Sequence, residues 1–237
     1  MRLIGFSTGA LAYSDFRRGL AIIRGREIHA VELSALRQHE LRPLVAAVDG
    51  MDLSQFSYIS FHAPSEISRE DEEAVVELLL WVTGRGWPII VHPDAVHDFS
   101  HWRRLGDLLC IENTDKRKRI GRTVEELSRV FRELPDASFC FDMGHARQVD
   151  STMTEAYFIL KAFGARLRQI HVSEVNTRSK HDPLSYGSIL AFREVAHLIP
   201  EEIPVILETP VPEEEIDLEM ERAIEALPLC QEAMLAR

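Results

Sequence analysis

The sequence has few cysteines, no long hydrophobic run and fewer basic than acidic side chains. No apolar stretch approaches the roughly 20 residues of a membrane-spanning helix. Met1 and Arg2 lead directly into a strand-like segment that lacks the features of a signal peptide. We therefore expect a cytoplasmic protein without a membrane partner. The cysteines Cys110, Cys140 and Cys230 follow no spacing pattern, so buried thiols are expected rather than disulfides or metal ligands.

The net charge of −11 argues against a protein that coats DNA or a membrane surface, although a local basic patch could still bind an anion. The 237 residues, of which 46% are hydrophobic, suit one globular domain over residues 1–237. The sequence contains no linker and no low-complexity tract. It is compatible with a homo-oligomer but does not fix the oligomeric state.

Short apolar segments alternate with helix-like segments along the whole chain. The predicted strands are residues 3–7, 27–33, 57–62, 88–92, 108–112, 138–142, 167–172 and 205–208. The predicted helices are residues 15–24, 40–48, 68–84, 99–105, 189–198 and 214–226, with two more that begin near Thr123 and Thr152. Eight continuously apolar strands, each followed by a helix, predict an α/β protein with the (β/α)8 TIM barrel fold. An open doubly wound sheet would need a glycine-rich phosphate turn after its first strand, and residues 5–9 do not match one.

Nearly every predicted strand ends in a histidine or an acidic residue. The strand ends carry His62, His92, Glu112, Asp142, His171 and Glu208, with His145 just beyond the sixth strand and His181 in the loop after the seventh. Because active sites of such barrels lie at the carboxyl ends of the strands, we expect these side chains to converge. Carboxylates mixed with imidazoles suit Zn²⁺, Mn²⁺, Co²⁺ or Mg²⁺, and the set is large enough for one to three ions.

Four of these strand ends carry a resemblance to a known group of proteins. The segments 111–114, 142–145, 170–172 and 207–209 resemble the strand ends of the xylose isomerase-like TIM barrel superfamily, which includes sugar epimerases and endonuclease IV-type apurinic endonucleases. The resemblance implies that one catalytic divalent ion is held by Glu112, Asp142, His171 and Glu208.

In the isomerase and epimerase branch, the ion would bind a carbonyl and an adjacent hydroxyl of a sugar or sugar phosphate. Glu112 and Glu208 would remove and return a proton from opposite sides of the substrate carbon, and His145 would bond a substrate oxygen. A xylose isomerase would carry a lysine soon after the fifth-strand glutamate, whereas Asn113 and Thr114 follow here. Isomerisation or epimerisation by proton transfer is therefore the first hypothesis.

In the endonuclease branch, three zinc ions would be held by nearly the same residues. One ion would bind His62, His92 and Glu112; Glu112 would bridge to a second at Asp142, His171 and Glu208; His145 and His181 would contribute to the third. Ser179 stands where that family has a ligand aspartate, and Ser65 stands where we would expect an aromatic in a DNA-contacting loop. Cleavage of abasic DNA is therefore the second hypothesis. A non-catalytic sugar- or metal-binding barrel is the third, and the presence of both Glu112 and Glu208 disfavours it.

Basic residues gather in the loops that follow the predicted strands. They include Lys116 in the run 116–119, Arg147, Arg178 and Lys180. A basic catalytic face would favour an anionic substrate, either a sugar phosphate or a nucleic-acid backbone, although such a run can also be a solvated turn. Glu32 in the second strand is expected to contact substrate, to support a ligand or to form a structural salt bridge.

Overall fold

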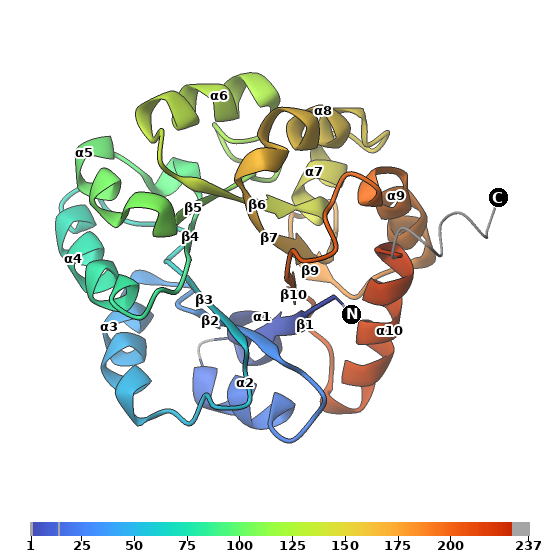
Figure 1. The fold of residues 1–237 in the computed structure, drawn as a ribbon, viewed down its shortest axis with the longest axis horizontal. Helices are drawn as coiled ribbons and strands as arrows, with labels where there is room; N and C mark the ends of the chain where they lie inside the picture. The colour runs from blue at the N-terminus through green and yellow to red at the C-terminus, as the bar shows by residue number, and fades with distance from the viewer. Residues whose placement is uncertain (1, 14, 229–237) are drawn as a thin grey trace.

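Eight parallel strands close into a barrel that is surrounded by helices (Figure 1). The computed structural model describes residues 2–13 and 15–228. The strands are β1 (Ile4–Ser7), β2 (Ala30–Ser34), β3 (Tyr58–His62), β4 (Ile89–Val91), β5 (Leu109–Glu112), β6 (Ser138–Asp142), β7 (Leu167–Val172) and β10 (Val205–Leu207). They are hydrogen-bonded in the order β1-β10-β7-β6-β5-β4-β3-β2. The predicted (β/α)8 TIM barrel is confirmed.

Helices lie outside the barrel between successive strands. They are α2 (Phe16–Ile23), α3 (Gln38–Ala47), α4 (Glu72–Thr83), α5 (Phe99–Trp102), α6 (Val124–Glu133), α8 (Thr154–Phe163), α9 (Tyr186–Ala196) and α10 (Ile216–Ala226). Short 3-10 turns are Val48–Gly50, Pro93–Ala95, Arg103–Leu108, Gly164–Arg166 and Glu213–Glu215. In the described part of the chain, no helix has the length and apolar character needed to span a bilayer.

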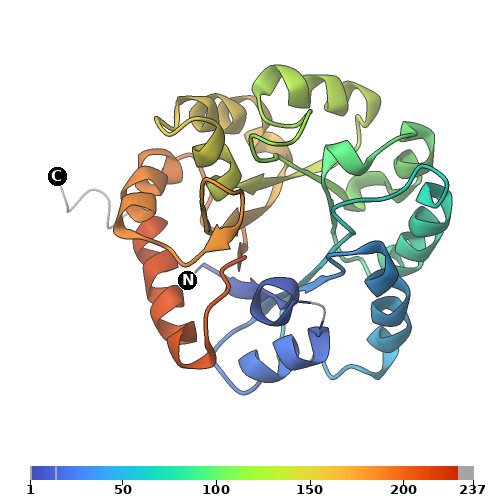
Figure 2. The same ribbon diagram turned by 180° about the vertical axis from the view of Figure 1, so that it is seen from behind.

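Apart from the 3-10 turns, three elements of the described structure were not predicted, and all three lie at the end of the barrel where the strands finish. They are α1 (Thr8–Ala12), α7 (Met143–Val149) and the antiparallel hairpin of β8 (Glu174–Val175) and β9 (His181–Asp182). Figure 2 shows α1 and the hairpin over this end of the barrel. Each is short and rich in polar or small residues, so hydrophobic periodicity could not reveal it.

Of the helices predicted to begin at Ser68, Thr123 and Thr152, two begin differently in the structure. Thr123 caps α6 as predicted, because its hydroxyl accepts a hydrogen bond from the Glu126 amide at 3.3 Å. The cap of α8 is Met153, in a left-handed conformation with φ of 60°, and Thr152 lies one residue earlier. Helix α4 begins only at Glu72, whereas the capping hydrogen bond that Ser68 accepts from the Asp71 amide lies in the turn before it.

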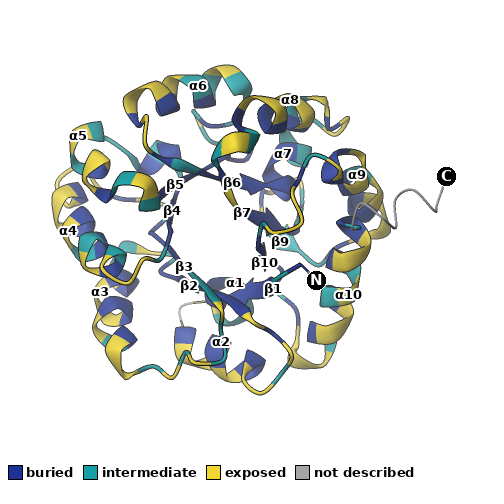
Figure 3. Cartoon of the chain, in the orientation of Figure 1, coloured by how far each residue is buried: buried dark blue, intermediate teal, exposed yellow. Residues whose placement is uncertain are grey.

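The core has two parts because side chains alternate between the two faces of each strand. Outward-facing residues form the large apolar core beneath the helices, while the outer helix faces are exposed (Figure 3). Inside the barrel, Ile90, Cys110 and Cys140 form a small separate cluster. Cys110 and Cys140 are buried free thiols, as predicted, whereas Cys230 lies outside the described residues.

Candidate metal centre

The strand ends deliver their polar side chains to one point inside the barrel mouth. In four strands, a residue whose side chain points into the barrel is followed two positions later by a polar residue. Because side chains alternate along a strand, both members of such a pair lie on the same face. Such pairs are Ile90 with His92, Cys110 with Glu112, Cys140 with Asp142, and Gln169 with His171. The polar residues therefore form a layer directly above the small interior cluster.

Four residues that were expected to share an ion lie together. Glu112, Asp142, His171 and Glu208 each offer one ligand atom, and these atoms lie within 4.8 Å of one another. The Nδ1 atom of His171 is 3.2 Å from Glu112 Oε1 and 3.5 Å from Glu208 Oε2. The spacing suits one divalent ion held by three carboxylates and one imidazole.

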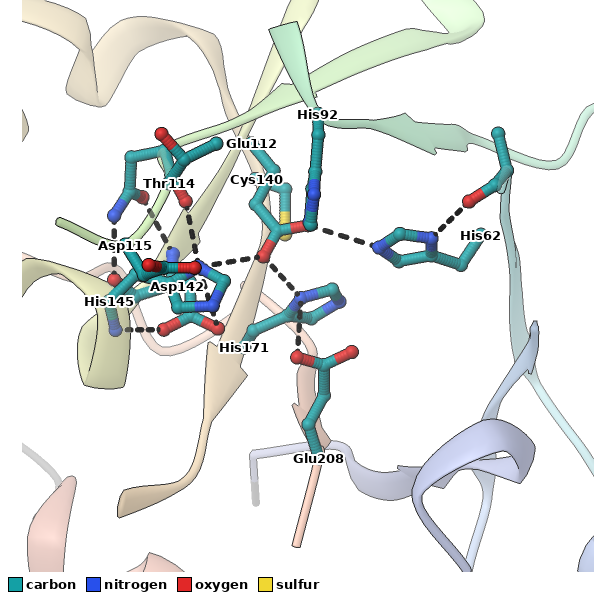
Figure 4. A network of polar contacts seen from close by, with 12 residues as sticks. His62, His92, Glu112, Thr114, Asp115, Cys140, Asp142, His145, His171 and Glu208 are labelled. Carbon is teal, nitrogen blue, oxygen red and sulfur yellow. Dashed lines mark hydrogen bonds and ion pairs between the residues drawn. The ribbon is translucent and has the colours of Figure 1, made fainter. Parts of the chain in front are cut away.

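A second group of possible ligands consists of His62, His92 and Glu112, so it shares Glu112 with the first group (Figure 4). The Oε2 atom of Glu112 is 3.2 Å from the Nε2 atoms of both His62 and His92. Its Oε1 atom faces His171 and also His145, whose Nδ1 is 3.4 Å away. Glu112 is fully buried and has a histidine contact on each oxygen, so it can bridge two ions.

His145 reaches the centre because α7 begins immediately after β6. The Asp142 carboxylate caps this helix by accepting a hydrogen bond from the His145 amide at 2.6 Å. A Cβ atom at Gly144 would lie 2.5 Å from the Ser173 carbonyl oxygen, so the close approach of the chain after β7 requires a glycine there. The sequence Asp142 to His145 is therefore a tight turn that carries two polar groups into one site.

His181 lies at the edge of the centre, on the hairpin. Its Nδ1 atom is 2.7 Å from the Ser173 hydroxyl and 3.8 Å from Glu208 Oε2, and its ring centroid is 5.5 Å from that of His145. Ser179 in the same hairpin bonds Gln148 through its hydroxyl at 2.8 Å and 3.1 Å. The structure thus brings all eight predicted ligand candidates to one end of the barrel, with His181 the outermost.

The chemistry of the unsatisfied atoms fits a cation. Among the described residues, the buried side-chain atoms without a hydrogen-bond partner include Glu112 Oε1, Asp142 Oδ2 and His171 Nδ1, all within the four-residue group. His92 Nδ1 is unpaired as well, but the nitrogen of His92 that faces Glu112 is Nε2. Buried polar atoms in folded proteins are nearly always paired. Carboxylate oxygens and imidazole nitrogens that face one another without a hydrogen bond are the donor set of a divalent metal site. The residues present therefore fit a bound ion of this class.

Burial and charge shift the pKa values in opposite directions across the centre. Burial raises the pKa of the Glu208 carboxyl to about 7 and that of Asp142 to about 6. For His62 and His145, burial favours the neutral ring, but surrounding carboxylates outweigh it and raise the pKa to about 9 and about 10 respectively. At neutral pH without metal, both imidazoles are therefore protonated.

Metal binding is accordingly expected to release protons. A nitrogen ligand must lose its proton before it binds an ion. Although burial favours the neutral ring of His171, nearby acidic groups hold its pKa well above the ordinary value, and the pKa values of His62 and His145, the candidate ligands of further ions, also lie above pH 7. The apparent affinity for Zn²⁺ should therefore rise as pH increases from about 6 to about 9. Calorimetric titration at pH 7 in buffers of different ionisation enthalpy measures the number of protons released. A heat independent of the buffer would contradict this expectation.

Two pockets flank the hairpin at the barrel mouth. A pocket of about 360 Å³ is lined by Glu208 and His181 together with Tyr13, Leu36 and other small or apolar residues. A more polar pocket of about 610 Å³ is lined by His92, His145 and His181 on one side and by charged loop residues on the other. Ser179 and His181 belong to both pockets, so a ligand in either would meet the same hairpin.

The predicted substrate-binding side chains do not all reach these pockets. Lys180 lines the smaller one, while Lys116 and Arg178 are exposed and line neither. Arg147 forms an ion pair with Glu174 at 3.3 Å. Instead, Arg117, Lys118 and Arg119 line the larger pocket, Lys118 being paired with Asp94 at 2.8 Å. The same pocket also carries Glu66, Asp94 and Asp115, and Arg117 is paired with Asp115 at 3.2 Å, so its edge is mixed in charge. The run 116–119 signalled the basic residues of this edge, but which members face inward depends on the loop conformation.

Glu32 lies below the centre and does not reach the mouth. Its side chain is fully buried, and its Oε2 atom is 3.0 Å from His171 Nε2. Gln169, which the sequence did not single out, lies beside it and also bonds Glu32. An uncharged glutamine within an apolar strand carries no sequence signal for this role.

Comparison with known proteins shows the fold. No family model matches the sequence, and no curated protein matches it. Among solved structures, a xylose isomerase domain protein from Alicyclobacillus acidocaldarius subsp. acidocaldarius matches with a TM-score of 0.65 and 13% identity over 94% of this chain and 98% of that chain. A xylose isomerase-like TIM barrel protein from Mycobacterium smegmatis, in complex with magnesium, matches with a TM-score of 0.58 and 13% identity over 96% and 98%. SacUVDE matches with a TM-score of 0.52 and 16% identity over 92% and 84%. The chain therefore has the fold of the xylose isomerase-like TIM barrels.

Proposed function

We propose that the protein is a divalent-metal-dependent isomerase or epimerase that transfers a proton at a carbonyl and adjacent hydroxyl of a sugar or sugar phosphate. The observation that carries the proposal is the group of Glu112, Asp142, His171 and Glu208, of which Glu208 lines a pocket of small-molecule size at the barrel mouth. The names of two structural neighbours, a xylose isomerase domain protein and a magnesium-bound xylose isomerase-like barrel, support the same class.

Within this proposal, some residues of the chain bind the ion and some transfer a proton to or from the substrate. The ion would be held by the four residues named above and would supply Lewis-acid polarisation of the substrate carbonyl. Glu208 has a side chain that is 12% exposed and lines a pocket, so it can exchange a proton with substrate. Glu112 is fully buried with histidines at both oxygens, so it can act as the opposing base only when one of these contacts opens. His145 would donate a hydrogen bond to a substrate oxygen.

Solvent exchange tests the proposal on a panel of compounds, so the substrate need not be identified first. Metal-loaded protein is incubated in D2O with a panel of ketoses and ketose phosphates, and proton NMR follows the hydrogen next to the carbonyl. We expect deuterium to replace this hydrogen in at least one compound, with formation of an isomer or epimer. Phosphorylated compounds should react faster than the free sugars if Arg117 and Arg119, which line the larger pocket, bind phosphate. Exchange in none of the panel, together with cleavage of abasic-site DNA, would contradict the proposal.

The shared ligand Glu112 favours a second candidate function, a multi-zinc phosphodiesterase that cleaves abasic DNA. His62, His92 and Glu112 form a complete group for a further ion, and Arg117 and Arg119 lie on the adjoining pocket. Ser179 in place of an aspartate, bonded to Gln148, weakens the third ion site. Elemental analysis of protein purified without chelators separates the candidates: about one ion per chain fits the isomerase, and two or three zinc ions with strand cleavage fit the nuclease.

A further inference from the structure

The two ring nitrogens of His171 face different groups: Nε2 faces Glu32, and Nδ1 faces the candidate ion site. The Nε2 atom of the imidazole is 3.0 Å from Glu32 Oε2, and the Nδ1 atom faces Glu112 and Glu208. Nδ1 has no hydrogen-bond partner among the described residues. The ring thus spans the boundary between the centre and the interior of the barrel below it.

A neutral imidazole carries one proton, and the neighbour of each nitrogen decides where that proton lies. Two groups face Nε2 of His171, the Glu32 carboxylate at 3.0 Å and the side-chain amide nitrogen of Gln169 at 2.7 Å. The Gln169 amide has two other acceptors for its protons, Glu32 Oε2 at 2.8 Å and Cys140 Sγ at 3.8 Å. A carboxylate oxygen only accepts hydrogen bonds, so the charged Glu32 favours the proton on Nε2 of His171. The lone pair then lies on Nδ1 and points to the shared ligand group. We propose that Glu32 is a positioning residue that fixes this tautomer and ring orientation, so that His171 binds the ion through Nδ1. This inference rests on the metal centre of the proposed function but not on the reaction.

The surroundings of Glu32 are built to keep its carboxylate in place. Besides His171, its Oε2 atom accepts hydrogen bonds from Gln169 Nε2 at 2.8 Å and from the Ser60 hydroxyl at 3.2 Å. The Gln169 amide is oriented in turn, because its Oε1 atom accepts a hydrogen bond from the Tyr58 hydroxyl at 2.8 Å. Glu32, Ser60, Gln169 and His171 are all fully buried. Water therefore does not compete for these contacts, and the carboxylate cannot rotate away without leaving donors unpaired.

The same geometry gives Glu32 a role that a simple structural ion pair would not have. If the Glu32–His171 salt bridge only stabilised the barrel, it would not determine which of the two ring nitrogens of His171 binds the ion. A carboxylate bonded to the far nitrogen of a ligand histidine also raises the basicity of the near nitrogen, and such partners strengthen metal binding by about 10–100-fold. Metal affinity and the identity of the bound nitrogen therefore distinguish the two roles.

The test uses Zn²⁺ alone as the probe. In the zinc-loaded wild-type protein, long-range proton–nitrogen NMR should show His171 coordinated through Nδ1, with its proton on Nε2. Competition with a chromophoric chelator should show zinc affinity about 10–100-fold lower in Glu32→Gln than in wild type. The matched control is Ser60→Ala, which removes another contact of the same carboxylate without touching His171, and its affinity should stay close to that of wild type.

The possible results either support or contradict the positioning role of Glu32. Coordination of His171 through Nε2 would overturn the inference, as would zinc affinity in Glu32→Gln equal to that of wild type. If Glu32→Gln does not fold, as thermal unfolding of the metal-free protein would show, the wild-type NMR spectrum decides by itself. A wild-type protein that binds no divalent ion would overturn the proposed function as well, which separates the two failures.

Discussion

Substituting Glu208 with glutamine is expected to slow deuterium exchange into the substrate by about 10²–10⁴-fold, the usual contribution of a general base. Glu208 follows β10 directly and lines a pocket, and its carboxylate lies 3.5 Å from His171 Nδ1. Glutamine keeps the size of the side chain but cannot accept the proton. The rate of exchange in D2O measures the effect, with the most reactive compound of the ketose panel as substrate.

Wild-type protein that binds a compound of the panel but exchanges no deuterium would be a non-catalytic barrel. Where the wild type does exchange, Glu208→Gln tests the role of Glu208 as the base. Glu214→Gln is the matched control, since this glutamate lies six residues later and is exposed, and its exchange rate should equal that of wild type. Ligand binding by Glu208→Gln, measured calorimetrically with the same compound, should persist if the ion is retained. If both variants exchange deuterium at the wild-type rate, Glu208 is not the base and the proposed mechanism is wrong.

Substituting Glu112 with glutamine is expected to have the largest effect on metal binding. Its two carboxylate oxygens lie within 3.4 Å of nitrogen atoms of His62, His92, His145 and His171. The amide removes the negative charge from the middle of both ligand groups. Zinc affinity should therefore fall by more than the about 100-fold that loss of a ligand's hydrogen-bonding partner can cause. Chelator competition and elemental analysis of the purified variant measure this loss.

A control for Glu112→Gln must change the same residue type without touching the centre. Glu125→Gln meets this condition, because Glu125 lies on the surface of α6 with a side chain that is 78% exposed. It should retain the metal content of wild type. The number of ions lost in Glu112→Gln also tests whether one carboxylate serves two ions: loss of one ion while another stays would show that it does not bridge them.

Much of the barrel could be predicted because strands buried on both faces are continuously apolar. Segments 138–142 and 167–172 coincide with β6 and β7, and the other predicted strands differ from the structure by one to three residues at one or both ends. Strand β2 shows the largest shift, since it begins at Ala30 and not at residue 27. Residues 27 and 29 are exposed. The mixed apolar and polar pattern there does not mark where pairing with β1 begins.

The small elements at the mouth could not be predicted, for a physical reason. Helix α7 contains Gly144 in its first turn, a residue that disfavours helices by about 1 kcal/mol, and it forms there because the chain after β7 packs against it. The hairpin turn is held by Gln148, whose Nε2 atom bonds the Asn176 carbonyl at 2.6 Å. Both depend on contacts between segments far apart in the sequence.

The sequence by itself determined the fold class and the set of polar residues at the strand ends. Both follow from local patterns, because a strand's period of two residues and the parallel order of a barrel place those residues on one edge. Only the tertiary structure decided which atoms meet. Glu32 and His171 are 139 residues apart, and His62 and Glu112 are 50 apart. Barrel closure and the tilt of the strands set these distances, and no local pattern encodes them. The division of Glu112 between two ligand groups and the support of His171 by Glu32 are therefore properties of the closed barrel.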